Sequence, residues 1–320
     1  MRGTLFLSDG IEASWGASLD AAAPGFTRVV SSPGASEPDY SSIEVLYFSG
    51  DVFPERSREF AVAALKSENL RWMHTFSAGV DDAFFRTLIE RGVRLTTSSG
   101  AQAEPIAQTA ILYLLALSRD LPGWLEDQRN RHWNPRSVRD LQGLRLGVVG
   151  LGPIGQAVAR LGAALGMGVT GFRRTPRGDE PWETLSMAEL PGLLPELDAL
   201  VVAVPLTEAT RNLMDEAAFA RLKPGALFVN VARGEVVDED ALIDSLRSGR
   251  LGGAGLDVFR QEPLPEESPL WAMPNVLITP HSSGTSPGNE VRASRIFIEN
   301  LRAYLGGEPL RNEVGPEGVR

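Results

Sequence analysis

The chain has 320 residues, 43% of them hydrophobic, with a formal net charge of −10 and no cysteine. This length suits two domains with ample cores. The lack of cysteine excludes disulfides and cysteine-ligated metals, and an acidic surface disfavours nucleic acid because it repels phosphate. The first residues do not have the basic and apolar pattern of a signal peptide, so we expect no such leader. The longest strongly apolar stretch, 110–117, is far below the roughly 20 residues of a membrane span. We expect a cytoplasmic protein without a membrane partner.

The first hundred residues alternate short apolar runs with helical or turn-rich stretches. The apolar runs predict strands at 5–7, 27–30, 45–48, 70–76 and 93–96. Between the third and fourth runs, a helix is predicted over 54–65 from the helical spacing of its apolar residues. Strands that alternate with helices predict a parallel sheet with helices on its faces. This part of the chain therefore predicts a small doubly wound domain.

Two different segments follow. A strongly apolar helix is predicted over 104–119, with Pro105 in its first turn, where proline is tolerated. The next stretch, 122–141, is polar and arginine-rich and contains Trp124 and Trp133. We expect this stretch to form an arm rather than a core element.

A second alternating series begins at Leu144. Its predicted strands are 146–149, 169–172, 199–204, 226–231, 253–257 and 276–279. Helices are predicted over 156–165 and 290–305, and Gly306 and Gly307 end the second of them. The series predicts a second parallel sheet with helices on both faces.

A glycine-rich loop lies between the first strand and the first helix of that series. In such a loop the first glycine makes the turn, the second lets the backbone approach a pyrophosphate, and the third lets helix and strand pack. The N-terminus of the helix then offers free N–H groups to phosphates. The alternative is an ordinary glycine-rich turn. We predict a dinucleotide site formed by Gly150, Gly152, Pro153, Ile154 and Gly155.

Arginines follow the next predicted strand, where dinucleotide-binding domains usually carry an acidic residue for the ribose hydroxyls. The segment 171–177 reads GFRRTPR. An acid would repel a 2′-phosphate, whereas arginines attract it. We therefore predict that NADP(H) is preferred over NAD(H), with Arg173 and Arg174 as a clamp and Thr175 as a hydroxyl donor. The alternative is a solvated surface run of arginines.

Arg233, Glu262 and His281 each end or follow a predicted strand. Ligands of open α/β sheets bind at the carboxyl ends of the strands. An arginine can grip an anionic substrate, a histidine can transfer a proton, and a carboxylate can tune that histidine. Alternatively, Arg233 pairs with Glu235 or Asp238, and Glu262 merely caps a loop.

A loop of small residues follows the fourth strand of the first domain. Small residues there expose backbone N–H groups, which suits a carboxylate, and the alternative is a plain turn. We take Ser77, Ala78 and Gly79 as candidate substrate contacts. We take His74 as a strand residue and His132 as a residue of the arm. No histidine and carboxylate cluster has ligand spacing, so no metal is expected.

Together these motifs are similar to those of the D-isomer-specific 2-hydroxyacid dehydrogenase family. The resemblance spans nearly the whole chain and is strongest over 70–311. The motifs that carry it are 77–81 (SAGVD), 150–155 (GLGPIG), 201–207 (VVAVPLT), 230–234 (NVARG), 257–263 (DVFRQEP) and 280–284 (PHSSG).

The resemblance implies an α/β protein of two doubly wound parallel-sheet domains. A Rossmann cofactor domain, 101–287, is inserted in a flavodoxin-like substrate or lid domain, 1–100 and 288–320. The active site of such proteins lies between the two domains, and closure excludes water. The resemblance also implies a homodimer, formed through the Rossmann domain and the 122–141 arm.

The implied activity is NAD(P)H-dependent reduction of a small 2-keto acid to the D-2-hydroxy acid, and the reverse. His281 would be the proton donor, Glu262 would favour its charged form, and Arg233 would hold the substrate carboxylate and polarise the carbonyl. Backbone groups of Ala78 and Gly79 would receive the carboxylate from the other side. The residues implied to line the nicotinamide nucleotide are Pro205, Val231, Ala232 and Asp257.

Two departures and two rival functions accompany this interpretation. In members of this family the helix after the first domain usually reads Val-Ala-Glu. Here Gln108 stands in place of the glutamate, and Arg173 replaces the acidic residue that binds the ribose.

One rival function is that of a β-hydroxyacid dehydrogenase, whose catalytic lysine would have to be Lys66 or Lys223, neither of them well placed. The other is a cofactor-responsive binding or corepressor-type protein without turnover. The motifs favour a hydroxypyruvate/glyoxylate-type or broad 2-ketoacid reductase, but they do not reveal the pocket that selects the keto acid.

Overall fold

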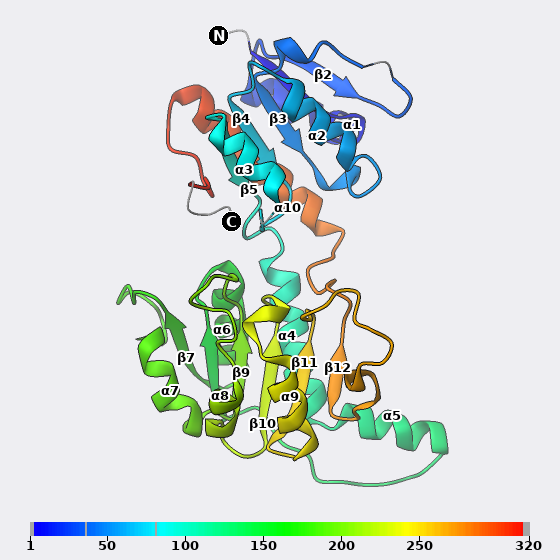
Figure 1. Cartoon of the computed structure of the whole chain (residues 1–320), viewed down its shortest axis with the longest axis vertical. Coiled ribbons are helices and arrows are strands. Elements are labelled where there is room, and N and C mark those ends of the chain that lie inside the picture. Colours follow the sequence, from blue (N-terminus) through cyan, green and yellow to red (C-terminus); the bar gives the residue numbers. More distant parts are fainter. Residues whose placement is uncertain (1–2, 36, 81, 316–320) are drawn as a thin grey trace. The chain divides into compact units, whose positions relative to one another are not determined.

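The structure is a computed structural model that describes residues 3–35, 37–80 and 82–315. The chain divides into two compact units (Figure 1). We call Met1–Gln102 with Ser286–Arg320 the split unit, because it contains both ends of the chain, and Ala103–Thr285 the central unit. Each unit has a wholly parallel sheet, which confirms the predicted α/β fold with two doubly wound domains.

The split unit is built on a five-stranded sheet of order β2-β1-β3-β4-β5. Its strands are β1 (Thr4–Ser8), β2 (Thr27–Ser31), β3 (Val45–Phe48), β4 (Trp72–Thr75) and β5 (Arg94–Thr97). Its helices are α1 (Asp9–Ala22), α2 (Ser57–Lys66), α3 (Ala83–Glu90) and α10 (Gly288–Gly306), with short 3-10 turns η1 (Tyr40–Ser42) and η2 (Gly50–Val52). This strand order is the flavodoxin-like one, in which the direction of the connections switches between β1 and β3.

Two apolar cores cover the two faces of this sheet. Successive strand residues point to opposite faces. Phe6 of β1 therefore packs with Phe60 of α2 in one core, whereas Leu5 of β1 packs with Phe297 of α10 in the other. The helix predicted over 54–65 begins at Ser57, three residues later than expected.

The central unit is built on a seven-stranded sheet of order β12-β11-β10-β9-β6-β7-β8. Its strands are β6 (Arg145–Val149), β7 (Gly168–Arg173), β8 (Glu183–Ser186), β9 (Ala199–Val202), β10 (Ala226–Asn230), β11 (Leu251–Leu256) and β12 (Val276–Ile278). Its helices are α4 (Ala103–Ser118), α5 (Leu121–Asn130), α6 (Pro153–Ala164), α7 (Leu190–Leu193), α8 (Glu216–Arg221) and α9 (Glu239–Arg247), with 3-10 turns η3 (Met187–Glu189), η4 (Leu194–Glu196), η5 (Gly234–Val236) and η6 (Pro269–Ala272). The strand order is that of a Rossmann domain with one further strand, and it reverses between β6 and β9.

The predicted arm is partly helical. Asp120 accepts a hydrogen bond from the backbone N–H of Gly123 at 3.3 Å, and Pro122 lies in the first turn, so that α5 begins at Leu121. None of the residues of α5 is buried, and residues 131–140 that follow form neither helix nor strand. In the part of the chain that the structure describes, no helix has the length and apolar composition needed to cross a membrane.

Candidate active site

The segments that carry Arg233, Glu262 and His281 leave the same edge of the central sheet. They follow β10, β11 and β12, which are parallel neighbours ending at Asn230, Leu256 and Ile278. Adjacent strands lie about 4.8 Å apart. Three segments separated by up to 48 residues in sequence therefore begin next to one another, at the edge where α/β sheets bind ligands.

His281 and Glu262 form a direct pair. Nδ1 of His281 lies 2.8 Å from Oε2 of Glu262, and the two side chains are 47% and 37% exposed. The other carboxylate oxygen, Oε1, accepts the backbone N–H of Phe259 at 3.0 Å, which fixes the orientation of the carboxylate. With Nδ1 directed at the carboxylate, Nε2 is the ring nitrogen that can exchange a proton with a ligand. This arrangement suits a general acid and base.

A buried carboxylate organises the turn that presents this imidazole. Asp257 is 3% exposed, and it accepts the backbone N–H groups of Ser282 and Ser283 at 2.9 Å each. It also accepts the hydroxyl of Thr279 at 2.5 Å and that of Ser283. The backbone N–H of His281 donates to the carbonyl of Asp257 at 2.8 Å. His281 itself has φ of +49°, a left-handed conformation that costs a non-glycine residue about 1–2 kcal/mol.

Helix α4 extends this network with a tyrosine. The Tyr113 hydroxyl lies 2.6 Å from the Thr279 hydroxyl and 3.3 Å from the carbonyl oxygen of Leu256. Burial raises the pKa of Tyr113 to about 12, so the group is a neutral hydroxyl at physiological pH. Sequence reasoning placed Asp257 beside the nicotinamide but missed this network. In the sequence Tyr113 is one more residue of an apolar helix, with nothing to distinguish it from core.

The turn that carries Arg233 packs closely on the loop that carries Glu262. The side chain of Asn230 accepts the N–H of Ala232 at 3.0 Å and donates to the carbonyl of Arg233 at 3.1 Å, which holds the turn in shape. A Cβ added to Gly234 would lie 1.9 Å from the carbonyl carbon of Phe259, so this backbone approach requires glycine. The Arg233 guanidinium donates to the carbonyl of Ala232 at 2.8 Å.

The glycine loop between β6 and α6 has the geometry that a dinucleotide site requires. Gly150 has φ of +96°, and a Cβ on Gly155 would lie 1.7 Å from the carbonyl oxygen of Gly150. A Cβ on Gly152 would meet nothing within 4 Å, and Gly152 caps α6 without a side chain. The first turn of α6, with Pro153, therefore presents backbone N–H groups to an open space that suits a pyrophosphate. These residues fit an NAD(P) cofactor.

One arginine of the predicted clamp, Arg173, forms an ion pair with Glu180. Nη1 of Arg173 lies 2.9 Å from Oε1 of Glu180, with side chains 19% and 9% exposed. Glu180 also accepts the backbone N–H groups of Arg177 and Gly178 at 3.2 and 2.8 Å. Burial alone would raise the pKa of Glu180, but these hydrogen bonds outweigh it and lower that pKa. Glu180 thus folds the loop back on Arg173, while Arg174 is exposed.

The other residues predicted to contact the cofactor differ in their exposure to solvent. Pro205 and Thr175 are exposed, whereas Val231 and Ala232 are buried, at 5% and 6% exposure. A buried residue there offers a ligand its backbone rather than its side chain.

The candidate carboxylate loop belongs to the split unit and follows β4. The Ser77 hydroxyl donates to the carbonyl of Gly79 at 2.6 Å, which turns the loop. Within residues 3–35, 37–80 and 82–315, no hydrogen-bond acceptor meets the backbone N–H groups of Ala78 and Gly79. Asp81, the last residue of the SAGVD motif, lies outside the described residues. The loop has donors available for an anion.

The lysines and His74 have structural partners. Lys66 pairs with Glu37 at 3.0 Å, and Lys223 with Asp198 at 2.7 Å, at the amino ends of β9 and β10, opposite the glycine loop. His74 is fully buried and hydrogen-bonded to two hydroxyls, and burial lowers its pKa to about 3, so it is a neutral core residue. Among the described residues, no group of three or more His, Asp or Glu is arranged to hold a metal ion.

Comparison with known proteins decides the family. The family model for the NAD-binding domain of D-isomer-specific 2-hydroxyacid dehydrogenases matches residues 111–283, which is more than half of the chain. The chain belongs to this family. Its membership confirms the resemblance drawn from the sequence motifs.

Several similar proteins have a known activity or a bound ligand. A glyoxylate reductase from Korarchaeum cryptofilum is 34% identical over 258 residues, which cover 78% of either chain. The crystal structure of a D-isomer-specific 2-hydroxyacid dehydrogenase from Xanthobacter autotrophicus, in complex with NADPH and MES, has a TM-score of 0.80 at 35% identity over 99% of this chain and 98% of that one. An NADPH-dependent glyoxylate/hydroxypyruvate reductase from Sinorhizobium meliloti, in complex with NADP and sulfate, has a TM-score of 0.78 at 29% identity over 99% of both chains.

Proposed function

We propose that this protein is an NADPH-dependent reductase that converts a 2-keto acid to the D-2-hydroxy acid. The observation that carries the proposal is the His281–Glu262 pair, held at 2.8 Å on an ordered turn at the same sheet edge as the glycine loop. Relatives that are glyoxylate and hydroxypyruvate reductases support the same reaction class. In this proposal the cofactor domain spans 101–287 and includes the whole central unit, and the substrate domain spans 1–100 and 288–320, which lie in the split unit.

Each site residue has a distinct role in the proposed reaction. The cofactor, when bound, supplies a hydride from its nicotinamide C4. His281 donates a proton from Nε2 to the carbonyl oxygen, and Glu262 stabilises the charged imidazole. Arg233 binds the substrate carboxylate and polarises the carbonyl. Ser77, Ala78 and Gly79 offer the carboxylate a second set of donors.

The cofactor would be held by residues of the central unit. Gly150, Gly152, Pro153, Ile154 and Gly155 would bind the pyrophosphate. The residues proposed to line the nicotinamide nucleotide are Pro205, Val231, Ala232 and Asp257.

We propose NADP(H) as the preferred cofactor. The strand tip carries Arg173 and Arg174 where an acid would bind a ribose hydroxyl, and two relatives were solved with NADPH or NADP. The pair with Glu180 holds the guanidinium of Arg173 in one place but offsets part of its charge, so Arg174 and the hydroxyl of Thr175 would complete the phosphate site.

We also propose a homodimer formed through the central unit and its arm. Leu121, Trp124 and Leu125 are exposed apolar residues that share one face of α5, and Trp133 in the segment after it is 96% exposed. An exposed apolar face of this kind marks a contact surface. Sedimentation of the wild type and of a Trp133→Ser variant would test this assignment.

The deciding experiment measures NADPH oxidation with glyoxylate, hydroxypyruvate, pyruvate and phenylpyruvate, and repeats each assay with NADH. Turnover supports the proposal, provided that hydroxypyruvate, pyruvate and phenylpyruvate give D-configured products; the product from glyoxylate is achiral. A clear preference for NADH would contradict the cofactor assignment. Tight NADPH binding without turnover on any of these acids would instead favour a cofactor-responsive binding protein.

A further inference from the structure

An aromatic cavity opens in the split unit next to the candidate carboxylate loop. Its volume is about 320 Å³. The phenylalanines that line it come from β3, the loop before α2, the segment after β4, and α3: Phe48, Phe53, Phe76, Phe84 and Phe85. No sequence motif pointed to this cavity, because its walls come from four separate segments.

The cavity and the carboxylate loop share a wall. Thr75, Phe76 and Ser77 line the cavity, and Ser77 is the first residue of the loop whose N–H groups at Ala78 and Gly79 are available to an anion. In a 2-keto acid only the carbonyl carbon separates the carboxylate from the side chain. If the loop holds the carboxylate, the side chain therefore lies close to this shared wall. The cavity is therefore within reach of the substituent that distinguishes one 2-keto acid from another.

We infer that this cavity receives the substrate side chain and that the enzyme favours 2-keto acids with a neutral aromatic side chain, of the phenylpyruvate class, over glyoxylate. The inference rests on the proposed function and adds the substrate class to it. Glyoxylate has no side chain to place in the cavity, whereas a benzyl group would displace water from it.

The size and shape of the cavity suit a phenyl ring. An apolar cavity of about 150 Å³ in another protein already binds benzene. The rings of Phe53 and Phe76 lie 5.5 Å apart at 46°, and those of Phe48 and Phe76 lie 5.6 Å apart at 85°. Such tilted and edge-to-face pairs are the arrangements that aromatic rings prefer, so a further ring can join them favourably.

Charge at the cavity favours a neutral side chain. Arg58 and Asp82 also line it, one cation and one anion. A carboxylate on the substrate side chain would be attracted by the first and repelled by the second, and an ammonium group the reverse. An uncharged ring avoids both this repulsion and the cost of desolvating a charge.

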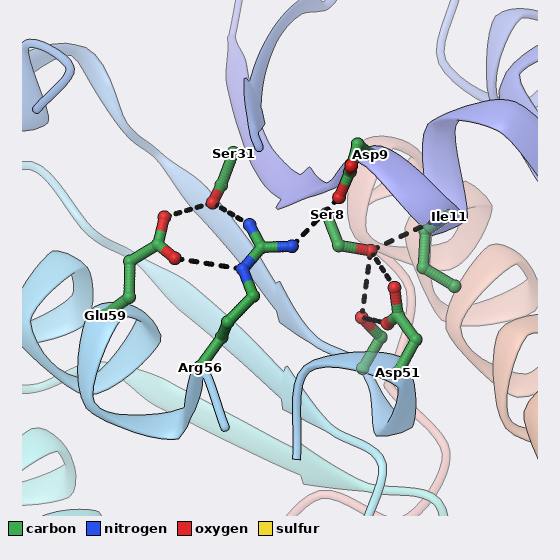
Figure 2. A network of polar contacts seen from close by, with 8 residues as sticks. Ser8, Asp9, Ile11, Ser31, Asp51, Arg56 and Glu59 are labelled. Atoms are coloured by element: carbon green, nitrogen blue, oxygen red, sulfur yellow. Dashed lines mark hydrogen bonds and ion pairs between the residues drawn. The ribbon is translucent and has the colours of Figure 1, made fainter. Parts of the chain in front are cut away.

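The loop that bears Phe53 is anchored on its N-terminal side. Asp51 accepts the hydroxyl of Ser8 at 2.6 Å and that of Ser49 at 2.5 Å, and both serines are fully buried. Ser8 in turn accepts the N–H of Ile11 at the start of α1 (Figure 2). Asp51 therefore ties the start of the loop to the carboxyl ends of β1 and β3.

The same loop is anchored on its C-terminal side. Figure 2 shows the guanidinium of Arg56 between the ends of β1 and β2: it donates to Asp9 at 2.9 Å, to Glu59 at 3.1 Å, and to Ser31. Phe53 lies between the two anchors and is 57% exposed. A wall fixed in advance binds a ring without the entropic cost of ordering the loop.

A second cavity offers a rival location for the side chain. In the central unit, a cavity of about 400 Å³ is lined by Leu264, Trp271 and Ile278 together with Glu262 and His281. It is also apolar, and it adjoins the candidate proton donor. A test must therefore separate the two cavities.

The test compares kcat/KM for phenylpyruvate and glyoxylate with NADPH in four proteins. These are the wild type, Phe53→Ala, Trp271→Ala for the rival cavity, and Leu65→Ala as a control for loss of an exposed apolar side chain from α2. We expect the wild type to favour phenylpyruvate and Phe53→Ala to lower the ratio about tenfold, a typical effect of one apolar contact in a specificity pocket. Trp271→Ala and Leu65→Ala should leave the ratio unchanged.

The opposite results overturn the inference. A wild-type preference for glyoxylate would do so, as would a ratio that responds to Trp271→Ala and not to Phe53→Ala. Saturation-transfer NMR with 3-phenylpropanoate gives a readout that needs no turnover: its ring protons should receive saturation from the wild type and much less from Phe53→Ala. Ring binding without any turnover would refute the proposed reductase and keep the aromatic site. Turnover without ring binding at Phe53 would refute the aromatic site alone.

Discussion

Replacing Asp257 with alanine tests whether a buried carboxylate positions the proton donor. The change removes the acceptor for the N–H groups of Ser282 and Ser283 and for two hydroxyls, but it does not alter the chemical groups of His281 and Glu262. The imidazole would then stand on a turn that has lost its main hydrogen bonds. Its left-handed backbone conformation, φ of +49°, would no longer be supported.

The expected magnitude follows from the burial of these donors. A hydrogen bond to a charged group contributes about 1.5–3 kcal/mol. Ser283 is 7% exposed and cannot recover its bonds from water, whereas Ser282 and Thr279 are partly exposed and can. We therefore expect a loss of about 3 kcal/mol in the free energy of unfolding. Relaxation of the left-handed residue, worth about 1–2 kcal/mol, would misplace the imidazole and lower kcat about tenfold or more.

The assay measures kcat, KM, the Kd of NADPH and the unfolding midpoint for the wild type, Asp257→Ala and Asp257→Asn. The asparagine keeps an acceptor for the two backbone N–H groups, so it should recover much of kcat. If Asp257 mainly contacts the nicotinamide, the Kd of NADPH should rise in parallel with the loss of kcat. A kcat for Asp257→Ala within twofold of the wild type would refute the positioning role.

Three further predictions concern other parts of the central unit. His281→Ala should lower kcat by about 10²–10⁴ with the Kd of NADPH unchanged, because a positioned proton donor is lost; unchanged turnover would remove His281 from the mechanism. Arg173→Asp should move the kcat/KM preference toward NADH, and an unchanged preference would place the phosphate site elsewhere. Burial alone would raise the pKa of Asp198, but the N–H of Arg145 and the nearby cations outweigh burial and lower that pKa. The ionised carboxylate therefore stabilises the folded state above about pH 4, and this stabilisation is lost as the pH falls through the lowered pKa. Asp198→Asn should therefore reduce the free energy of unfolding at pH 7 by about 2 kcal/mol and by progressively less as the pH falls below about 4, as measured by urea unfolding. A difference that does not shrink as the pH falls would contradict this.

The sequence predicts the sheets well because strands buried on both faces appear as continuous apolar runs. β9 and β10 are buried throughout and were predicted within two residues at each end. β8 was missed because its sequence, ETLS, has a single apolar residue, Leu185, and so forms no apolar run. Helix α8 has only six residues, too few for a helical period to stand out.

Some features of the candidate site could be predicted from the sequence, and others appear only in the folded structure. His281 and Glu262 could be named because each follows a strand end within a short motif. The contacts that hold them could not be named, because Asp257 reaches residues 22 to 26 positions away. The arginine run at 173–174 was visible, but its partner Glu180 becomes apparent only when the loop folds back. The aromatic cavity depends on segments from Phe48 to Phe85 that meet only in the folded chain.

The most direct test of the central claim follows the hydride. NADPH carrying deuterium at both C4 positions is mixed with the protein and pyruvate or phenylpyruvate, and the product is examined by NMR and by chiral chromatography. We predict a D-2-hydroxy acid with one deuterium at C2, and loss of this product in His281→Ala. Bound NADPH that transfers no deuterium to either acid, or a product of the L configuration, would contradict the account.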